Sequence, residues 1–215
     1  MTWKTFCSGP LETNAYVLVD EGTPQCWIFD CPPEPYDLLD WLEAEKLTPQ
    51  AVYLTHAHAD HIGGLNELRE GYSSIPVAVH PLEASWLGDA EKNLSAWMGA
   101  LVIADPAERV LSMGEILTCG SVSAQVLAVP GHSPGSVAYW FEALSVVIGG
   151  DVVFRSGVGR WDLPGGDRVV LKKSVELLVG LPSQTRIFPG HGGTTTAGRE
   201  RTDNPYVRNP DAWVS

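Results

Sequence analysis

The sequence predicts an α+β fold in which two packed β-sheets carry helices on their outer faces. Short apolar segments with the spacing of hairpins alternate with segments of helical periodicity, and this pattern occurs twice along the 215 residues. No linker separates the two halves, and the sequence contains no short-period repeat. Because each apolar sheet face has to be covered, two such blocks favour two sheets with helices outside. With 44% hydrophobic residues the chain can bury one substantial core, so we expect a single domain over residues 1–215.

Strands and helices alternate in the first half. The expected strands are residues 14–20, 26–30, 51–55 and 75–79, and the expected helices are 34–45, 64–70 and 82–100, the last with a break near Gly88. Glycine and proline in residues 21–24 indicate the turn between the first two strands. Leu38, Trp41 and Leu42 recur at helical spacing, which predicts that the helix over 34–45 buries one face.

The second half is expected to repeat this plan. Its predicted strands are residues 115–119, 122–129, 136–141, 144–149 and 186–188. Asp167 is a favourable N-cap for a helix that runs through Val179, because apolar residues recur at helical spacing after it. A last short helix around residues 199–201 should end before Pro205.

The segment from Thr55 to Gly64 is the most informative of the chain. Its sequence is Thr-His-Ala-His-Ala-Asp-His-Ile-Gly-Gly, so residues 56–61 hold three imidazoles and one carboxylate directly after a predicted buried strand. Imidazole nitrogens and carboxylate oxygens are ligands that zinc, iron and manganese accept. A chance cluster of four such ligands on a plain surface loop is the weaker interpretation, so the run predicts a metal site.

Three more ligand candidates follow later in the chain, each at the end of a predicted strand and beside glycine. They are His132 after Pro130-Gly131, Asp151 after Gly149-Gly150, and His191 after Pro189-Gly190. Functional side chains often lie in loops that directly follow a rigid strand, and glycine lets the backbone of such a loop come close to a neighbouring group. His80 lies between Val79 and Pro81 without this context, and we interpret it as structural.

These ligands suffice for two metal ions. His56 and His58 have period-two spacing, so an extended segment can point both the same way. The expected sets are His56, His58 and His132 for one metal and Asp60, His61 and His191 for the other, with Asp151 as a bridge between them. Each metal keeps an open position for water, which is typical of a catalytic site rather than a structural one.

Charge and cysteine content indicate which partners and which cellular compartment to expect. The net charge of −12 argues against nucleic acid as a partner, because phosphate binding needs a basic surface. Four scattered cysteines without a C-x-x-C pair indicate free thiols in a reducing compartment; they are Cys7, Cys26, Cys31 and Cys119. The sequence has neither the apolar core of a signal peptide nor a run long enough to span a bilayer, so we expect no membrane association and a cytoplasmic location.

The H-x-H-x-D-H run with its distant His, Asp and His resembles the metallo-β-lactamase superfamily. The resemblance extends from residues 9–16 to Asn204-Pro205. It implies an αβ/βα sandwich of two mixed β-sheets flanked by helices, and two divalent metal ions, zinc first with iron or manganese as alternatives. Residues 150–154, 157–162 and 191–196, with Glu200, are most similar to the short glyoxalase II-like (hydroxyacylglutathione hydrolase-like) members.

This resemblance implies a dinuclear hydrolase that cleaves a small thioester, such as a hydroxyacylglutathione, with a metal-bridging hydroxide. Asp60 would be both a metal ligand and the catalytic residue that orients the nucleophile. Arg160, in Gly-Val-Gly-Arg, would bind a substrate carboxylate, to which a planar guanidinium is suited. Two features depart from the family pattern. Residues 30–32 are Asp-Cys-Pro where Asp-Pro-Gly is usual, and only 24 residues follow His191, so we expect no separate C-terminal helical substrate domain.

Other functions of the same residues stay open. A persulfide dioxygenase of this superfamily would use one iron held by His56, His132 and Asp151. The dinuclear centre could also serve a lactone or phosphoester hydrolase. A catalytically silent binding module is disfavoured by the intact ligand set. A true β-lactamase is disfavoured because Asp151 stands where the zinc β-lactamases with a cysteine ligand have Cys.

Overall fold

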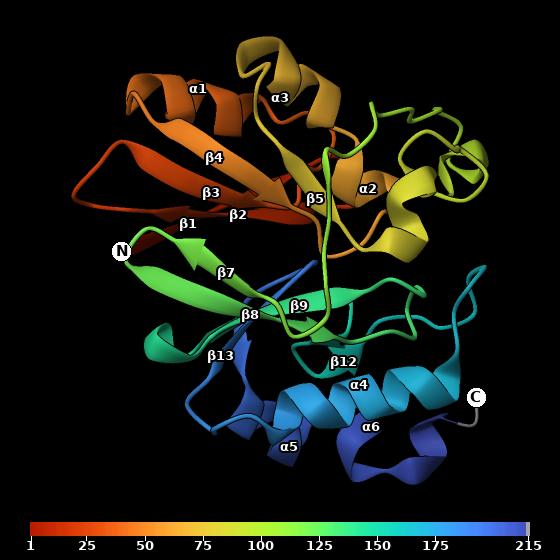
Figure 1. Ribbon diagram of the computed structural model, residues 1–215. Helices are drawn as coiled ribbons and strands as arrows, with labels where there is room; N and C mark the ends of the chain where they lie inside the picture. Colours follow the sequence, from red (N-terminus) through yellow and green to blue (C-terminus); the bar gives the residue numbers. More distant parts are fainter. Residues whose placement is uncertain (214–215) are drawn as a thin grey trace. The chain divides into compact units, whose positions relative to one another are not determined.

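A computed structural model describes residues 1–213 and contains two six-stranded mixed sheets, each with helices (Figure 1). The described chain divides into two units. Unit 1 comprises residues 1–112 and 118–122, and unit 2 comprises residues 113–117 and the described residues from 123 onward. That residues 1–215 act as one domain stays a prediction, and its last two residues lie outside the described part.

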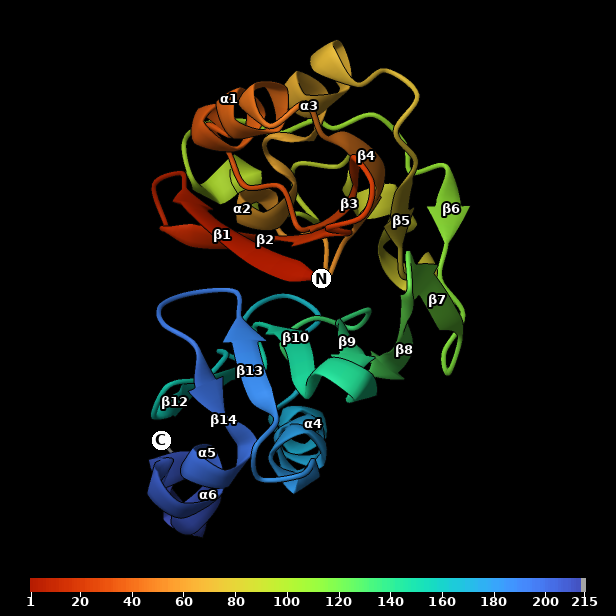
Figure 2. The ribbon, with the colours of Figure 1, turned by 90° about the vertical axis from the view of Figure 1, so that its left-hand side faces the viewer.

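The first sheet has the strand order β1-β2-β3-β4-β5-β6, which Figure 2 shows from one side. The strands are β1 (Thr2–Ser8), β2 (Thr13–Val19), β3 (Gln25–Phe29), β4 (Thr48–Tyr53), β5 (Val77–Val79) and β6 (Arg109–Val110). β1, β2 and β3 pair antiparallel, and β3 to β6 pair parallel. The parallel part requires long connections, and those connections carry the helices.

Three helices belong to unit 1, namely α1 (Tyr36–Ala44), α2 (Ala59–Ile62) and α3 (Leu65–Gly71). Leu42 of α1 and Leu68 of α3 join the same buried cluster as Val52 of β4, so both helices cover one face of the sheet (Figure 1). Successive strand residues point to opposite faces. Phe29 and Tyr53 therefore lie on the other face, where their rings stack with centroids 5.6 Å apart.

The second sheet has the order β14-β13-β10-β9-β8-β7. Its strands are β7 (Ile116–Cys119), β8 (Val122–Ala128), β9 (Val137–Phe141), β10 (Val146–Gly150), β13 (Arg186–Pro189) and β14 (Thr195–Thr196), and β11 (Val153–Phe154) with β12 (Gly157–Val158) forms a separate hairpin. The helices are α4 (Arg168–Gly180), α5 (Ala197–Asp203) and α6 (Pro205–Arg208). The parallel pair β10 and β13 is connected through α4, whose Val175 and Leu178 pack with Ile187.

The predicted N-cap of α4 is confirmed. The carboxylate of Asp167 accepts a hydrogen bond from the backbone N–H of Val170 at 2.9 Å. The four cysteines are free thiols, as expected, and three of them are buried. In the described part of the chain, no helix is long and apolar enough to cross a membrane.

The predicted helix over residues 82–100 is wrong. Only two 3₁₀ segments form there, Pro81–Trp86 and Ser95–Trp97. The Asn93 side chain donates hydrogen bonds to the carbonyls of Trp86 and Val102, at 3.1 and 2.9 Å. Such side-chain bonds compete with helical ones. The prediction also missed β1, because its half-exposed residues lack apolar alternation, and β6, β11, β12 and β14, because two-residue strands leave no periodicity.

Candidate metal centre

Unit 1 supplies four of the predicted ligands from the connection between β4 and α3. His56 and His58 lie in its extended part, and Asp60 and His61 lie on the single turn of α2. All four are buried, and the His56 ring centroid is 4.7 Å from that of His58 and 4.0 Å from that of His61. Nε2 of His61 lies 3.5 Å from Oδ2 of Asp60. Burial of so many polar groups in one place is costly unless hydrogen bonds or a metal compensate it.

Asp30, at the end of β3, fixes the orientation of two of these imidazoles. Its carboxylate accepts hydrogen bonds from the backbone N–H and the hydroxyl of Thr55, at 2.7 and 2.8 Å. Oδ2 of Asp30 is also 2.9 Å from Nδ1 of His61, and the Thr55 hydroxyl is 3.1 Å from Nδ1 of His56. Because both Nδ1 atoms have these partners, Nε2 is the nitrogen that each ring offers to a metal. A carboxylate behind a histidine is the usual support of a metal-binding imidazole.

The loop after β3 packs directly against α2. The backbone N–H of Cys31 donates to the carbonyl of His61 at 2.8 Å. A Cβ on Gly63 would lie 2.5 Å from Cγ of Pro33, and a Cβ on Gly64 would lie 2.3 Å from the carbonyl oxygen of Pro32. Only glycine fits these two positions, which explains the Gly-Gly pair that ends the histidine run.

Thr13, at the start of β2, holds the carboxylate of Asp60. Its hydroxyl donates a 2.8 Å hydrogen bond to Oδ2 of Asp60, and both side chains are buried. The hydrogen bond from Thr13 fixes the orientation of this carboxylate.

Unit 2 supplies the other three ligands from loops that follow β8, β10 and β13. Oδ2 of Asp151 lies 3.6 Å from Nε2 of His132 and 3.4 Å from Nε2 of His191. Nδ1 of His132 lies 2.8 Å from the carbonyl oxygen of Arg160, which again leaves Nε2 as the metal-binding nitrogen. A Cβ on Gly159 would be 1.9 Å from the carbonyl oxygen of Asp151. Glycine at this position therefore permits the close packing around Asp151.

The donor set suits divalent metal ions. Each of the seven predicted ligands belongs to a group of His and Asp side chains that could hold a metal. The set offers five imidazoles and two carboxylates, a combination that zinc, iron and manganese accept. His80 lies apart from these groups, and its ring accepts a hydrogen bond from the backbone N–H of Leu82 at 3.2 Å. This contact agrees with the structural interpretation of His80.

Arg160 is exposed and paired with Asp162. Nε and Nη2 of Arg160 donate to the two carboxylate oxygens of Asp162, both at 2.8 Å. This pair lowers the pKa of the Asp162 carboxyl to about 2. Both side chains are 62% exposed, so the guanidinium is accessible although two of its nitrogens are engaged.

Sequence reasoning missed three residues that support the unit 1 ligands, namely Thr13, Asp30 and Glu83. Asp30 offered a signal, since it is an acidic residue at the end of an apolar strand, as Asp151 is. Thr13 and Glu83 offered none, because their partners lie 47 and 26 positions away in the sequence.

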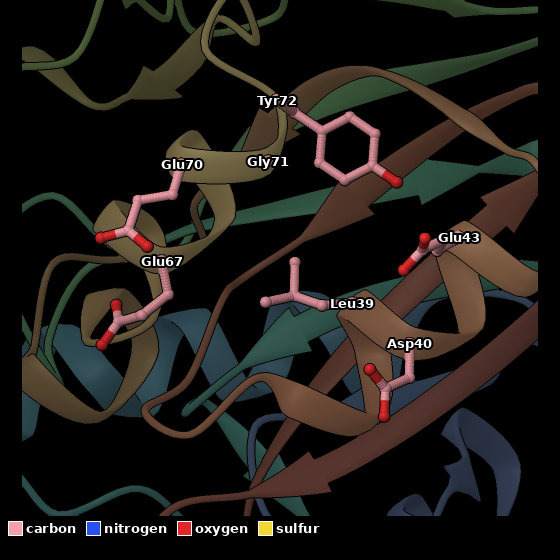
Figure 3. A pocket seen from close by; sticks show the side chains of 7 residues that line it. All are labelled: Leu39, Asp40, Glu43, Glu67, Glu70, Gly71 and Tyr72. Atoms are coloured by element: carbon pink, nitrogen blue, oxygen red, sulfur yellow. The ribbon is translucent and has the colours of Figure 1, made fainter.

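Unit 1 also carries an acidic groove between α1 and α3 (Figure 3). Its volume is about 520 Å³, and it is lined by Leu39, Asp40, Glu43, Glu67, Glu70, Gly71 and Tyr72. A cluster of carboxylates does not by itself identify a ligand, and we assign no binding role to this groove.

Comparison with known proteins identifies the family. The sequence model of the metallo-β-lactamase superfamily matches residues 8–191, a range that includes all seven predicted ligands. The chain belongs to the metallo-β-lactamase superfamily. The probable metallo-hydrolase YqgX of Bacillus subtilis is 41% identical over 209 residues, which cover 96% of this chain and 98% of that protein. The hydroxyacylglutathione hydrolase GloC of Haemophilus influenzae is 29% identical over 193 residues, which cover 85% and 87%.

Solved structures agree with this assignment. BLEG-1, a B3 metallo-β-lactamase, has a TM-score of 0.92 at 40% identity and covers 97% of this chain and 100% of its own. TTHA1623 in a di-iron-bound form has a TM-score of 0.84 at 39% identity, with coverage of 94% and 99%. ETHE1 from Myxococcus xanthus has a TM-score of 0.77 at 29% identity, with coverage of 96% and 84%. The predicted fold class, two mixed sheets flanked by helices in the metallo-β-lactamase fold, is therefore confirmed, and the chain is placed among the metallo-hydrolases of this superfamily.

Proposed function

We propose that the seven ligands hold two divalent metal ions in a hydrolytic centre. The expected sets are His56, His58 and His132 for one ion and Asp60, His61 and His191 for the other, with Asp151 between them. The support is that Asp151 Oδ2 lies within 3.6 Å of two imidazole nitrogens in unit 2. A carboxylate so placed can share its oxygens between two metals.

The proposed substrate is a small thioester of the hydroxyacylglutathione kind. The likeness to GloC and the segment 157–162 support this class. When bound, the metal ions would supply Lewis acidity, which polarises the thioester carbonyl and lowers the pKa of water so that hydroxide forms near neutral pH. Asp60 would accept a hydrogen bond from the attacking water and orient it, because Thr13 holds the carboxylate in place.

The other residues of the site would orient the ligands and the substrate and would not take part in the reaction themselves. Asp30 and Thr55 keep His56 and His61 in the tautomer that offers Nε2. Arg160 would bind a carboxylate of the substrate through the part of its guanidinium that Asp162 does not engage. Zinc is the proposed metal, and iron is the alternative that the di-iron form of TTHA1623 supports.

Two other activities have specific support. Persulfide oxidation is supported by the likeness to ETHE1 and by the Gly-Val-Gly-Arg-Trp-Asp segment. β-Lactam hydrolysis is supported by the 40% identity to BLEG-1. We place both below thioester hydrolysis. Persulfide oxidation needs only three of the seven ligands, and Asp151 differs from the cysteine of the zinc β-lactamases that use one.

Metal content and activity measured on one preparation test the proposal. We expect two metals per chain by elemental analysis, hydrolysis of S-lactoylglutathione, and loss of that hydrolysis after chelation with recovery on adding zinc. An Asp60→Ala variant that keeps its metals should lose most of the activity.

The same preparation should be assayed for oxygen uptake with glutathione persulfide and for β-lactam cleavage. One metal per chain together with oxygen uptake would overturn the hydrolase proposal. Faster cleavage of a β-lactam than of the thioester would overturn the substrate class. Near-wild-type turnover of the metal-loaded Asp60→Ala variant would overturn the role of Asp60.

A further inference from the structure

The ligand loop is the connection between β4 and α3, residues 54–64. Two of its backbone N–H groups donate hydrogen bonds to one distant segment of unit 1. The N–H of Ala57 donates to Oε2 of Glu83 at 2.7 Å, and the N–H of Ala59 donates to the carbonyl of Asn93 at 2.9 Å. Each N–H belongs to the peptide group that directly follows a ligand, His56 in the first case and His58 in the second. Because a peptide group is planar, holding its N–H also fixes the backbone from which the preceding imidazole projects.

The segment that makes these contacts, residues 80–104, is itself held together by hydrogen bonds. The Asn93 side chain binds the carbonyls of Trp86 and Val102, and its Oδ1 accepts from the N–H of Ser95 at 3.0 Å. The ring of Trp86 stacks on His58, with centroids 6.0 Å apart and planes 25° apart. The segment thus contacts the ligand loop through a carboxylate, a carbonyl and an aromatic ring.

Glu83 is the unusual member of this set. Its exposed fraction is 0%, and it lies in the 3₁₀ segment Pro81–Trp86. A buried carboxylate is costly to desolvate unless hydrogen bonds and nearby positive charge compensate that cost. A negative charge becomes favourable at this position if dications bind to the adjacent histidines, since opposite charges attract strongly where water is excluded.

We propose that Glu83 is a positioning residue of the metal centre. Its carboxylate sets the backbone between His56 and His58 and adds a negative charge beside the metal that these two ligands hold. The inference rests on the proposed metal centre but not on the thioester substrate. Glu83 touches neither substrate nor the reacting atoms in this role, and it acts only through the ligand loop.

Metal affinity of Glu83→Gln, measured without substrate, tests this role. The variant keeps the size of the side chain and a hydrogen-bond acceptor but loses the charge. We expect its zinc affinity, measured by competition with a chelator, to fall by about 10- to 100-fold, the usual loss when a support of a metal ligand is removed. The thermal midpoint of the metal-free protein should stay close to wild type. Cobalt-substituted protein should show altered visible absorption bands, and Glu83→Asp, which keeps the charge, should lose less affinity.

Glu108→Gln is the matched control. Glu108 also accepts a backbone N–H within unit 1, from Val77 at 2.8 Å, and it pairs with Arg69 of α3. This variant should bind zinc with wild-type affinity.

Three outcomes would overturn the inference: equal affinity of Glu83→Gln and wild type, equal losses in both Gln variants, or failure of metal-free Glu83→Gln to fold. The last would make Glu83 a requirement of the fold itself. A wild-type protein that binds zinc but does not cleave thioesters would contradict the proposed substrate and leave this inference intact.

Discussion

At the scale of single residues, the sequence pointed to the candidate ligands through local patterns, whereas most of the residues that contact them became visible only in the fold. His56 to His61 form a contiguous run, and His132, Asp151 and His191 each follow a strand beside glycine, so both patterns are local. Asp30 and Glu83 act through partners 25 to 31 positions away, which only the fold brings together. The position of Asp30 at the end of an apolar strand was a local signal, whereas the sequence around Glu83 does not distinguish a buried supporting carboxylate from a surface one.

The role of Arg160 is decided by kinetics rather than by its contacts. If the guanidinium binds a substrate carboxylate, Arg160→Gln should raise KM for the thioester by about 10- to 150-fold and leave kcat nearly unchanged, since a hydrogen bond to a charged group contributes roughly 1.5–3 kcal/mol. Asp162→Asn should lower KM, because it removes the partner's negative charge and leaves only one oxygen to accept from the guanidinium. Arg199→Gln is the control, because Arg199 is also an exposed arginine with an acidic partner, Asp203. Equal KM values for Arg160→Gln and Arg199→Gln would contradict substrate binding by Arg160.

At the scale of elements, the sequence predicted those in which capping, periodicity and turns agree. The helix α4 has an N-cap and a regular apolar face, and it forms where predicted. Residues 82–100 contain enough apolar residues for a helix, but Asn93 and Ser95 bind backbone groups instead, and Leu94 adopts a positive φ of 71°. Asn93 therefore has two roles: its side chain binds within the segment, and its backbone carbonyl accepts a hydrogen bond from the N–H of Ala59.

The cap of α4 should contribute measurable stability. Asp167→Ala removes the acceptor for the Val170 N–H and should lower the free energy of unfolding by about 1 kcal/mol. The measurement is urea denaturation of metal-free protein, which keeps ligand binding out of the result. Glu176→Ala on the exposed face of the same helix should change stability by less than about 0.5 kcal/mol. Equal effects of the two substitutions would show that the cap contributes nothing specific.

At the scale of the whole molecule, the two-block pattern of the sequence corresponds to the two units. The first mixed sheet lies in unit 1, and most of the second lies in unit 2. Each unit also supplies part of the proposed ligand set, four residues from unit 1 and three from unit 2. The chain is acidic, with a net charge of −12, and dications would offset part of that charge. Metal binding should therefore influence the stability of the entire chain and not only the loop that carries the histidine run.

This linkage can be measured by calorimetry of chelator-treated and zinc-reconstituted protein. A ligand at 100 times its Kd stabilises the native state by about 2.7 kcal/mol per site. In a chain of this size that corresponds to a rise in the thermal midpoint of roughly 5 to 11 °C for each site, or about 11 to 22 °C for two, in one transition. His191→Ala should reduce the rise although His191 lies in unit 2, whereas His80→Ala should keep it, because His80 lies outside the ligand set. Two separate transitions of which zinc moves only one, or an undiminished rise in His191→Ala, would contradict the proposed ligand sets, since a bound metal couples the unfolding of every segment that supplies it with a ligand.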